Sequence, residues 1–309
     1  MIPKEMLPDP LFLEEIGDLS TPRVGLAVLG RPIGHSISPI LHHAALSVLS
    51  KEDASFDLWQ YDRIDLEPSL LPEALEKLSL AGYIGLNLTI PHKVEVLKVL
   101  NDIDPEAQLM GAVNTLHFGS GSWVGHNTDG IGLSRAISTD LGIRFQDECI
   151  LIIGAGGAAR AASVQCLLEG CEFVHILNRS KERLNGLVEP LAERFGRNRI
   201  KGSSLEDLKI SDFKDKKWLV INATSVGLSE EDPSSLPFSC SLLSPESAVY
   251  DMIYNPTTTT LLKDAAKAGL DYSNGLSMLI FQAAKALEIW TQKEIPADIM
   301  FDAACKHFQ

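Results

Sequence analysis

One stretch of the chain, residues 149–160, limits the possible folds more than any other. It reads Cys-Ile-Leu-Ile-Ile-Gly-Ala-Gly-Gly-Ala-Ala-Arg, an apolar run followed by a glycine-rich turn and small residues. A strand that is apolar on both faces belongs at the centre of a parallel sheet covered by helices. Gly154 permits a tight turn, Gly156 lets the backbone approach a pyrophosphate, and Ala159 lets a helix pack on the strand. The pattern predicts a Rossmann-type dinucleotide site at a helix N-terminus, although a glycine-rich turn can also serve packing alone.

The next predicted strand ends in Asn178-Arg179-Ser180, and Arg183 follows. A chain that binds NAD usually carries Asp or Glu here to hold the ribose 2′-hydroxyl, and none is present. The two guanidiniums would attract a 2′-phosphate, so the sequence favours NADP. The alternative is solvated charge at a helix start, a place where cations oppose the helix dipole. The residues expected to bind the cofactor are Gly154, Ala155, Gly156, Gly157 and Ala158 in the turn, with Asn178, Arg179, Ser180 and Arg183 after the next strand.

Short apolar runs alternate with longer amphipathic stretches along the whole chain, which predicts an α/β fold with mostly parallel sheets. In the first 128 residues we expect strands at 24–30, 56–61, 84–90 and 113–118, and helical stretches at 39–49, 66–80 and 97–110. The pattern restarts at Asp129, with strands expected at 149–153, 173–177, 218–221 and 248–252, and helices at 131–141, 158–168 and 182–194. Two more helices are expected beyond Gly275, separated near Pro296. Two α/β domains are therefore expected.

Charge and composition exclude several classes of protein. The 309 residues carry a net charge of −14, which makes the chain a poor general binder of nucleic acid or anionic membrane. No apolar run approaches the roughly 18 residues of a membrane span, and no signal-peptide core is present at the N-terminus. The five cysteines are odd in number and, like the histidines, lack metal-ligand spacing. We expect a cytoplasmic protein with reduced thiols and no bound metal.

Hydroxyl and amide side chains gather near the ends of the strands expected in the first half. Ser36 and Ser38 precede a helix start, where two hydroxyls would suit a small carboxylate. Ser38 followed by proline also fits a simple N-cap. Asn87 and Thr89 share one face of a predicted strand, and the proline that ends this strand places Lys93 at the carboxyl edge of the sheet, where open α/β sheets bind ligands.

Two further polar groups lie near later strand ends of this half. Asn114 lies in a Gly-Ala-Val-Asn-Thr stretch, and Asp129 in an Asn-Thr-Asp-Gly stretch. From its spacing, Asp129 can equally be the N-cap of the helix that follows it.

Taken together, these motifs resemble the shikimate 5-dehydrogenase family from Val24 to about Trp290. The matching stretches are Gly-Arg-Pro-Ile-Gly-His-Ser-Ile-Ser-Pro, Asn-Leu-Thr-Ile-Pro-His-Lys, Gly-Ala-Val-Asn-Thr, Asn-Thr-Asp-Gly, the Gly154 turn, Asn-Arg-Ser, Asn-Ala-Thr-Ser-Val-Gly, Tyr-Asp-Met-Ile-Tyr-Asn-Pro and Gly-Leu-Ser-Met-Leu-Ile-Phe-Gln. So many motifs in one order are specific together.

The resemblance implies reversible reduction of 3-dehydroshikimate to shikimate by NADPH, in the route to chorismate and the aromatic amino acids. It implies a substrate domain of residues 1–128 with the C-terminal helices 275–309, and a Rossmann-type NADP domain of residues 129–274. It implies a catalytic pair of Lys93 and Asp129. It also implies that the substrate is bound by Ser36, Ser38, Asn87, Thr89, Asn114, Tyr254 and Gln282, and the nicotinamide end of the cofactor by Thr224, Met252 and Gly275.

The chemistry fits these assignments. Hydride reduction of a ketone leaves an alkoxide, which a lysine ammonium can stabilise and protonate. We expect Asp129 to orient Lys93 and hold a substrate hydroxyl. Three alternatives remain: a quinate/shikimate dehydrogenase that accepts NAD, a catalytically silent NADP sensor, and a two-domain folate-type dehydrogenase. The partners expected are small molecules only, and the chain is expected to be a monomer or homodimer.

Overall fold

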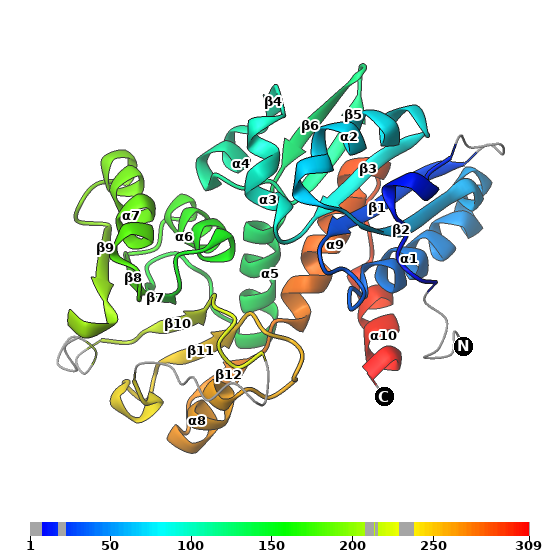
Figure 1. The fold of residues 1–309 in the computed structure, drawn as a ribbon. Helices are drawn as coiled ribbons and strands as arrows, with labels where there is room; N and C mark the ends of the chain where they lie inside the picture. Colours follow the sequence, from blue (N-terminus) through cyan, green and yellow to red (C-terminus); the bar gives the residue numbers. More distant parts are fainter. Residues whose placement is uncertain (1–7, 18–22, 208–212, 214–215, 229–237, 309) are drawn as a thin grey trace. The chain divides into compact units, whose positions relative to one another are not determined.

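A computed structural model describes residues 8–17, 23–207, 213, 216–228 and 238–308 (Figure 1). The chain divides into two compact units. Unit 1 comprises the described residues up to Thr128 together with those from Ile280 onward, and unit 2 comprises those from Asp129 to Leu279.

Within the described residues, unit 1 contains a six-stranded mixed sheet in the order β2-β1-β3-β5-β6-β4. β1 pairs in parallel with β2 and β3, β5 pairs antiparallel with β3 and β6, and β4 pairs in parallel with β6. The strands are β1 (Val24–Gly30), β2 (Trp59–Asp65), β3 (Tyr83–Leu88), β4 (Asp102–Ile103), β5 (Thr115–Gly119) and β6 (Ser122–His126). The chain runs from β1 to β2 on one side and then returns to β3 on the other, so the loops after β1 and β3 flank a reversal of strand order, the usual place for a ligand.

Unit 1 combines its sheet with several helices and a buried hydrophobic core. The helices are α1 (Ser38–Glu52), α2 (Leu71–Leu80), α3 (His92–Glu95), α4 (Pro105–Met110), α10 (Ala297–Phe308) and the part of α9 (Leu276–Thr291) that follows Leu279, with short 3-10 turns η1 (Leu13–Glu15), η2 (Ala54–Leu58), η3 (Pro68–Leu70) and η4 (Val96–Lys98). The buried core includes Leu29, Ile64, Leu78, Leu86 and Leu116.

Helix α9 is fixed to the sheet of unit 1 by Trp290. The indole Nε1 donates a hydrogen bond to Leu116 O at 2.9 Å. A Cβ atom at Gly85 of β3 would lie 2.5 Å from the indole, so only glycine allows the helix to approach this closely. This contact places the preceding turns of α9, including Gln282, over the strands that carry the polar side chains.

Unit 2 is a parallel sheet with the order β12-β11-β10-β7-β8-β9 over the part that the structure describes. Its strands are β7 (Cys149–Ile153), β8 (Phe173–Asn178), β9 (Ile200–Ser204), β10 (Leu219–Asn222), β11 (Ala248–Asp251) and β12 (Asp271–Ser273), and its helices and turns are α5 (Asp129–Leu141), α6 (Gly157–Leu168), α7 (Lys181–Phe195), α8 (Thr260–Ala268), η5 (Leu205–Asp207) and η7 (Cys240–Leu242). The strand order reverses between β7 and β10, so the Gly154 turn again lies at such a reversal.

The structure differs from the sequence-based expectations at several elements. The strand expected at 56–61 begins only at Trp59, because the Asp53 side chain accepts a hydrogen bond from Ser55 N and starts the turn η2. The short strands β4, β6, β9 and β12 and the helix α8 were not predicted. The antiparallel pairing of β5 with β6 follows from a two-residue turn, Ser120-Gly121, in which both residues have positive φ.

Candidate active site

The two serines predicted to bind a carboxylate lie together at the start of α1. Ser36 Oγ lies 3.2 Å from Ser38 Oγ and also accepts a hydrogen bond from Ser38 N at 3.4 Å. The N-cap position of α1 is Ile37, and Ser38 is the first helical residue, so the interpretation of Ser38 as an N-cap is wrong. Two hydroxyls beside the positive end of a 15-residue helix form a suitable receptor for a small anion.

Thr89 lies just beyond strand β3, which ends at Leu88 and not at residue 90 as the sequence suggested. Its backbone N donates to Leu29 O at 2.9 Å, which joins the segments after β1 and β3. A Cβ atom at Gly30 would lie 2.4 Å from the Thr89 methyl group, so glycine at the end of β1 makes room for Thr89. Thr89 is therefore held at the carboxyl edge of the sheet beside the loop that carries the serines.

Asn114 is the centre of a buried hydrogen-bond network in unit 1, and it is 2% exposed. Its Nδ2 donates to Thr128 Oγ1 at 3.0 Å and to Gln282 Oε1 at 3.4 Å, and its Oδ1 accepts from Thr128 N at 2.8 Å. Its backbone O accepts from Asn87 Nδ2 at 3.3 Å. Three predicted substrate residues, far apart in the sequence, are thus connected in one network.

The proposed catalytic residues lie on different units. Lys93 is half-buried in the short helix α3, and its backbone O accepts a hydrogen bond from Val113 N at 2.8 Å. Asp129 is the first residue of α5 in unit 2 and is 5% exposed. Tyr254 also belongs to unit 2, where burial raises the pKa of its hydroxyl.

The turn after β7 has the geometry that phosphate binding requires. Gly154 has φ +116°, and a Cβ atom there would lie 2.9 Å from Ala223 O, so this position requires glycine. In contrast, a Cβ atom at Gly156 or Gly157 would meet no atom within 4 Å, which leaves open space at the start of α6. Ala155 and Ala158 are half-buried beside them. A pyrophosphate fits here, against the free N–H groups of a 12-residue helix.

The segment after β8 presents two exposed cations. Ser180 Oγ accepts from Arg183 N at 3.2 Å and caps α7, while Asn178 Nδ2 donates to Ser180 O at 2.9 Å. The side chains of Arg179 and Arg183 are exposed, and within the described ranges neither forms an ion pair with a carboxylate. This segment therefore fits a 2′-phosphate, with the serine acting as a helix cap as well.

The residues expected at the nicotinamide end come together around Asn222. Asn222 Oδ1 accepts from Thr224 N at 3.1 Å and Thr224 Oγ1 at 2.7 Å, and Asn222 O accepts from Met252 N at 3.1 Å. A Cβ atom at Gly275 would lie 2.0 Å from Met252 O, so glycine allows the two backbones to touch. The segments after β10, β11 and β12 thus form one surface.

A buried carboxylate holds this surface in place. Asp251 accepts hydrogen bonds from Asn222 Nδ2, Ile253 N and Thr259 Oγ1. Burial raises the pKa of Asp251, and the three donors oppose that change. Asp251 was not among the residues predicted from the sequence.

Other residues of the network in unit 1 were also missed. The Tyr61 hydroxyl donates to Asn87 Oδ1 at 2.6 Å, and Asn87 Nδ2 donates to Thr115 Oγ1 at 3.1 Å. Thr128 completes the set through its bonds with Asn114. In the sequence, these residues are marked only as polar side chains within or beside apolar strands. This signal is weak because such side chains often form hydrogen bonds with the backbone.

In the part of the chain that the structure describes, no helix is long and apolar enough to cross a membrane. The same residues contain no group of three or more His, Cys, Asp or Glu side chains arranged to hold a metal ion. Four of the five cysteines are buried as free thiols, and burial raises the pKa of Cys166, Cys171 and Cys240.

Comparison with known proteins gives concordant matches over both units. Residues 28–116 match the shikimate dehydrogenase substrate binding domain, and residues 275–305 match the shikimate 5′-dehydrogenase C-terminal domain. A shikimate dehydrogenase (NADP(+)) of Geobacter metallireducens is 39% identical over 275 residues, which cover 89% of this chain and 93% of the relative.

Two solved structures are similar over nearly the whole chain. A crystal structure of a shikimate dehydrogenase in complex with NADP+ has a TM-score of 0.83 and 35% identity, covering 93% of this chain and 96% of that one. A shikimate 5-dehydrogenase from Thermus thermophilus in complex with NADP(H) and shikimate has a TM-score of 0.78 and 35% identity, covering 92% of this chain and 99% of that one.

Proposed function

Because the chain belongs to the shikimate dehydrogenase family, we propose that it catalyses the reversible, NADPH-dependent reduction of 3-dehydroshikimate to shikimate. The observation that carries this proposal is the Asn114 network, which joins Asn87 and Gln282 to it inside one unit. An array of amide and hydroxyl groups suits a substrate that carries several hydroxyl groups. The serine pair at the start of α1 supplies the receptor for its carboxylate.

Unit 1 with its C-terminal helices is the substrate domain in this proposal, and unit 2 is the NADP domain. Ser36 and Ser38 bind the carboxylate through their hydroxyls, supported by the positive end of the α1 dipole. The ring hydroxyls are bound by the remaining polar residues, Asn87, Thr89, Asn114, Asp129, Tyr254 and Gln282. The proposed partners of the chain are small molecules only, and its proposed state is a monomer or homodimer. Its proposed location is the cytoplasm, where reducing conditions are compatible with five free thiols.

The residues of unit 2 fit NADP. Its pyrophosphate would lie at the start of α6, over Gly156 and Gly157, where the open space is found. Arg179 and Arg183 would hold the 2′-phosphate, while Thr224, Met252 and Gly275 would contact the nicotinamide end. When bound, NADPH supplies the hydride for the reduction.

Lys93 and Asp129 are proposed as the catalytic pair. Lys93 stabilises the negative charge that develops on the substrate oxygen and donates the proton that completes the alcohol. In this proposal Asp129 holds a substrate hydroxyl and orients Lys93. In the oxidative direction Lys93 takes the proton back from the hydroxyl.

The proposal is tested by following nicotinamide absorbance with purified protein, using shikimate or quinate, each with NADP+ or NAD+. A strong signal with shikimate and NADP+ alone supports it. Comparable rates with quinate or NAD+ would move the chain to the dual-specificity enzymes. A folded protein that binds NADP+ but gives no signal in any of the four assays would be a catalytically silent sensor.

A further inference from the structure

The described N-terminal segment, residues 8–17, is built into the sheet of unit 1 beside β2. Leu11 forms a parallel bridge with Ile64, in which Leu11 N donates to Arg63 O at 2.8 Å and Asp65 N donates to Leu11 O at 2.9 Å. The side chains of Leu13 and Ile16 are buried in the core of the unit. The segment therefore extends the sheet next to β2 by one short parallel pairing.

Arg63 connects this segment to the loop that carries the serine pair. Its side chain is 7% exposed, and its two terminal nitrogens donate in different directions. Nη2 donates to Pro8 O at 2.5 Å, in the N-terminal segment, and Nη1 donates to Gly34 O, two residues before Ser36. A guanidinium suits this role because its donors are held in one rigid plane.

The same loop is attached to the end of β2 by a second arginine. Arg31 forms ion pairs with Asp65 and Glu67, both at 3.1 Å, and Arg31 N donates to Ile90 O at 3.1 Å. Both ion pairs involve partly exposed side chains and are therefore weak. Arg63 is the buried connection, and it reaches the middle of the loop.

We propose that Arg63, held between Pro8 O and Gly34 O, is a positioning residue that orders the 31–38 loop for the substrate carboxylate. This inference rests on the proposed function, in which Ser36 and Ser38 bind that carboxylate. The N-terminal segment thereby contributes to substrate affinity without touching substrate. Both hydrogen-bond acceptors are backbone carbonyls, and the nearby Asp9 carboxylate also attracts the guanidinium.

The main test is Arg63→Met in the full-length protein, measured with shikimate and with shikimate methyl ester. Loss of charged hydrogen bonds inside the unit is expected to raise KM for shikimate about five- to twentyfold, with kcat changed less than about twofold. The ester carries no carboxylate, so its kcat/KM is expected to change less than about twofold. Equal losses for the two substrates would overturn the proposal, because they would indicate a general effect on the fold.

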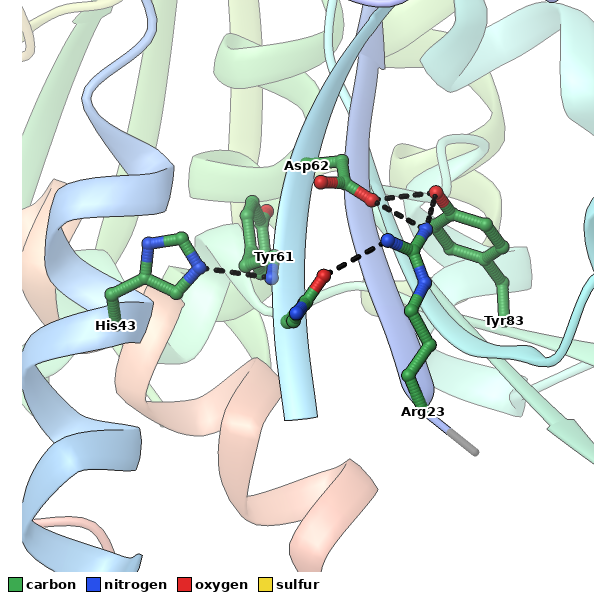
Figure 2. A network of polar contacts seen from close by, with 6 residues as sticks. Arg23, His43, Tyr61, Asp62 and Tyr83 are labelled. Atoms are coloured by element: carbon green, nitrogen blue, oxygen red, sulfur yellow. Dashed lines mark hydrogen bonds and ion pairs between the residues drawn. The ribbon is translucent and has the colours of Figure 1, made fainter. Parts of the chain in front are cut away.

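Arg23→Met is the matched control. Arg23 also bridges strands of this sheet, but at the amino end of β1, where it contacts Gln60, Asp62 and Tyr83 (Figure 2). This variant is expected to lower the melting temperature and leave KM for shikimate unchanged. If Arg23→Met raised KM as much as Arg63→Met, loss of stability and not loop order would be the cause.

Three further variants separate the possible failures. A chain that begins with methionine in place of Asp9 lacks Pro8 O and the Asp9 carboxylate but keeps Leu11, Leu13 and Ile16, and it is expected to raise KM for shikimate about two- to fivefold. Asp9→Asn in the full chain keeps Pro8 O and is expected to change this KM less than about twofold. An unchanged KM in the shortened chain would show that Pro8 has no part in the effect.

Ser36→Ala tests the carboxylate site itself. If this variant leaves KM for shikimate unchanged, the proposed function of the serine pair fails. If Ser36→Ala raises KM and Arg63→Met does not, only the proposed role of Arg63 is overturned.

Discussion

The Tyr61 hydroxyl donates a buried hydrogen bond of 2.6 Å to Asn87 Oδ1. With its oxygen occupied in this way, the Asn87 amide turns its Nδ2 to Asn114 O and Thr115 Oγ1. The amide is thus oriented from both sides, by β2 and by β5. If Asn87 binds a substrate hydroxyl as proposed, the orientation of its amide is already set, which lowers the entropy cost of binding.

Tyr61→Phe is expected to raise KM for shikimate several-fold and to lower the free energy of unfolding by about 1–3 kcal/mol, because Asn87 Oδ1 loses its buried donor. Steady-state kinetics and urea unfolding measure the two effects. Tyr272→Phe, at an exposed position on β12, is the control and should change neither. A Tyr61 variant with wild-type KM would show that the orientation of Asn87 does not matter for binding.

Lys93→Ala is expected to lower kcat by about 10²–10⁴, since a positioned acid–base group usually contributes that much. KM for NADP+ should remain near the wild-type value. Lys98→Ala removes an exposed lysine in the next turn, which pairs with Glu95, and should have wild-type kinetics. Turnover near wild type in Lys93→Ala would remove Lys93 from the mechanism.

Arg179→Ala is expected to raise KM for NADP+ about tenfold or more and to leave KM for NAD+ nearly unchanged, because only NADP+ carries the 2′-phosphate. Initial rates with each cofactor at saturating shikimate give both values. Arg197→Ala, which removes an exposed arginine paired with Glu189 in the same unit, is the control for net charge. Equal effects on the two cofactors would argue against recognition of the 2′-phosphate by Arg179.

Gly275→Ala is expected to lower the stability of the protein, whereas Gly156→Ala is expected to weaken NADP+ binding. A methyl group at Gly275 would overlap Met252 O, so the backbone must shift and the free energy of unfolding should fall by about 1–3 kcal/mol or more. A methyl group at Gly156 meets open space, so stability should hold while KM for NADP+ rises. Thermal unfolding with and without NADP+ distinguishes the two, and stable Gly275→Ala protein would contradict the close approach.

The stability of the protein is expected to fall on acidification through His42. This imidazole is buried and stacks on Tyr61, with centroids 4.1 Å apart. Burial, with a smaller effect of His43, lowers the pKa of His42 from 6.5 to about 3. Between these two values the unfolded chain binds a proton that the folded chain does not. The stability is therefore fully present above pH 6.5 and is lost as the pH falls towards 3, by up to about 1.4 kcal/mol per pH unit.

Urea unfolding between pH 7 and pH 4.5 measures this slope. His42→Phe keeps an aromatic ring against Tyr61 and is expected to flatten the curve. His35→Gln, at an exposed position, is the matched control for the loss of a histidine. If the slope of His42→Phe equalled that of the wild type, other groups would be responsible for the acid sensitivity.

The strand β7, the turn after it and the helix α6 could be predicted from the sequence because the residues that determine them are adjacent in the chain. Five apolar residues form a fully buried strand, and the residues that follow it are small where the turn and the helix require it. The serine pair was found for the same reason, since both hydroxyls lie within three residues of one helix start. Strands β4 and β12 were missed because they are only two and three residues long, too short to show a hydrophobic period.

By itself the sequence determined the α/β class, the restart at Asp129, the glycine turn and, through its ordered motifs, the family. The tertiary structure alone decided which distant residues meet. Tyr61 reaches Asn87 because their strands both pair with β1, and Gln282 reaches Asn114 because Trp290 fixes α9 to the sheet. Arg63 of β2 reaches both Pro8 and Gly34 because the N-terminal segment and β1 both pair with β2. Such contacts produce no periodic pattern in the sequence, because strand order and packing, and not spacing along the chain, determine which residues meet.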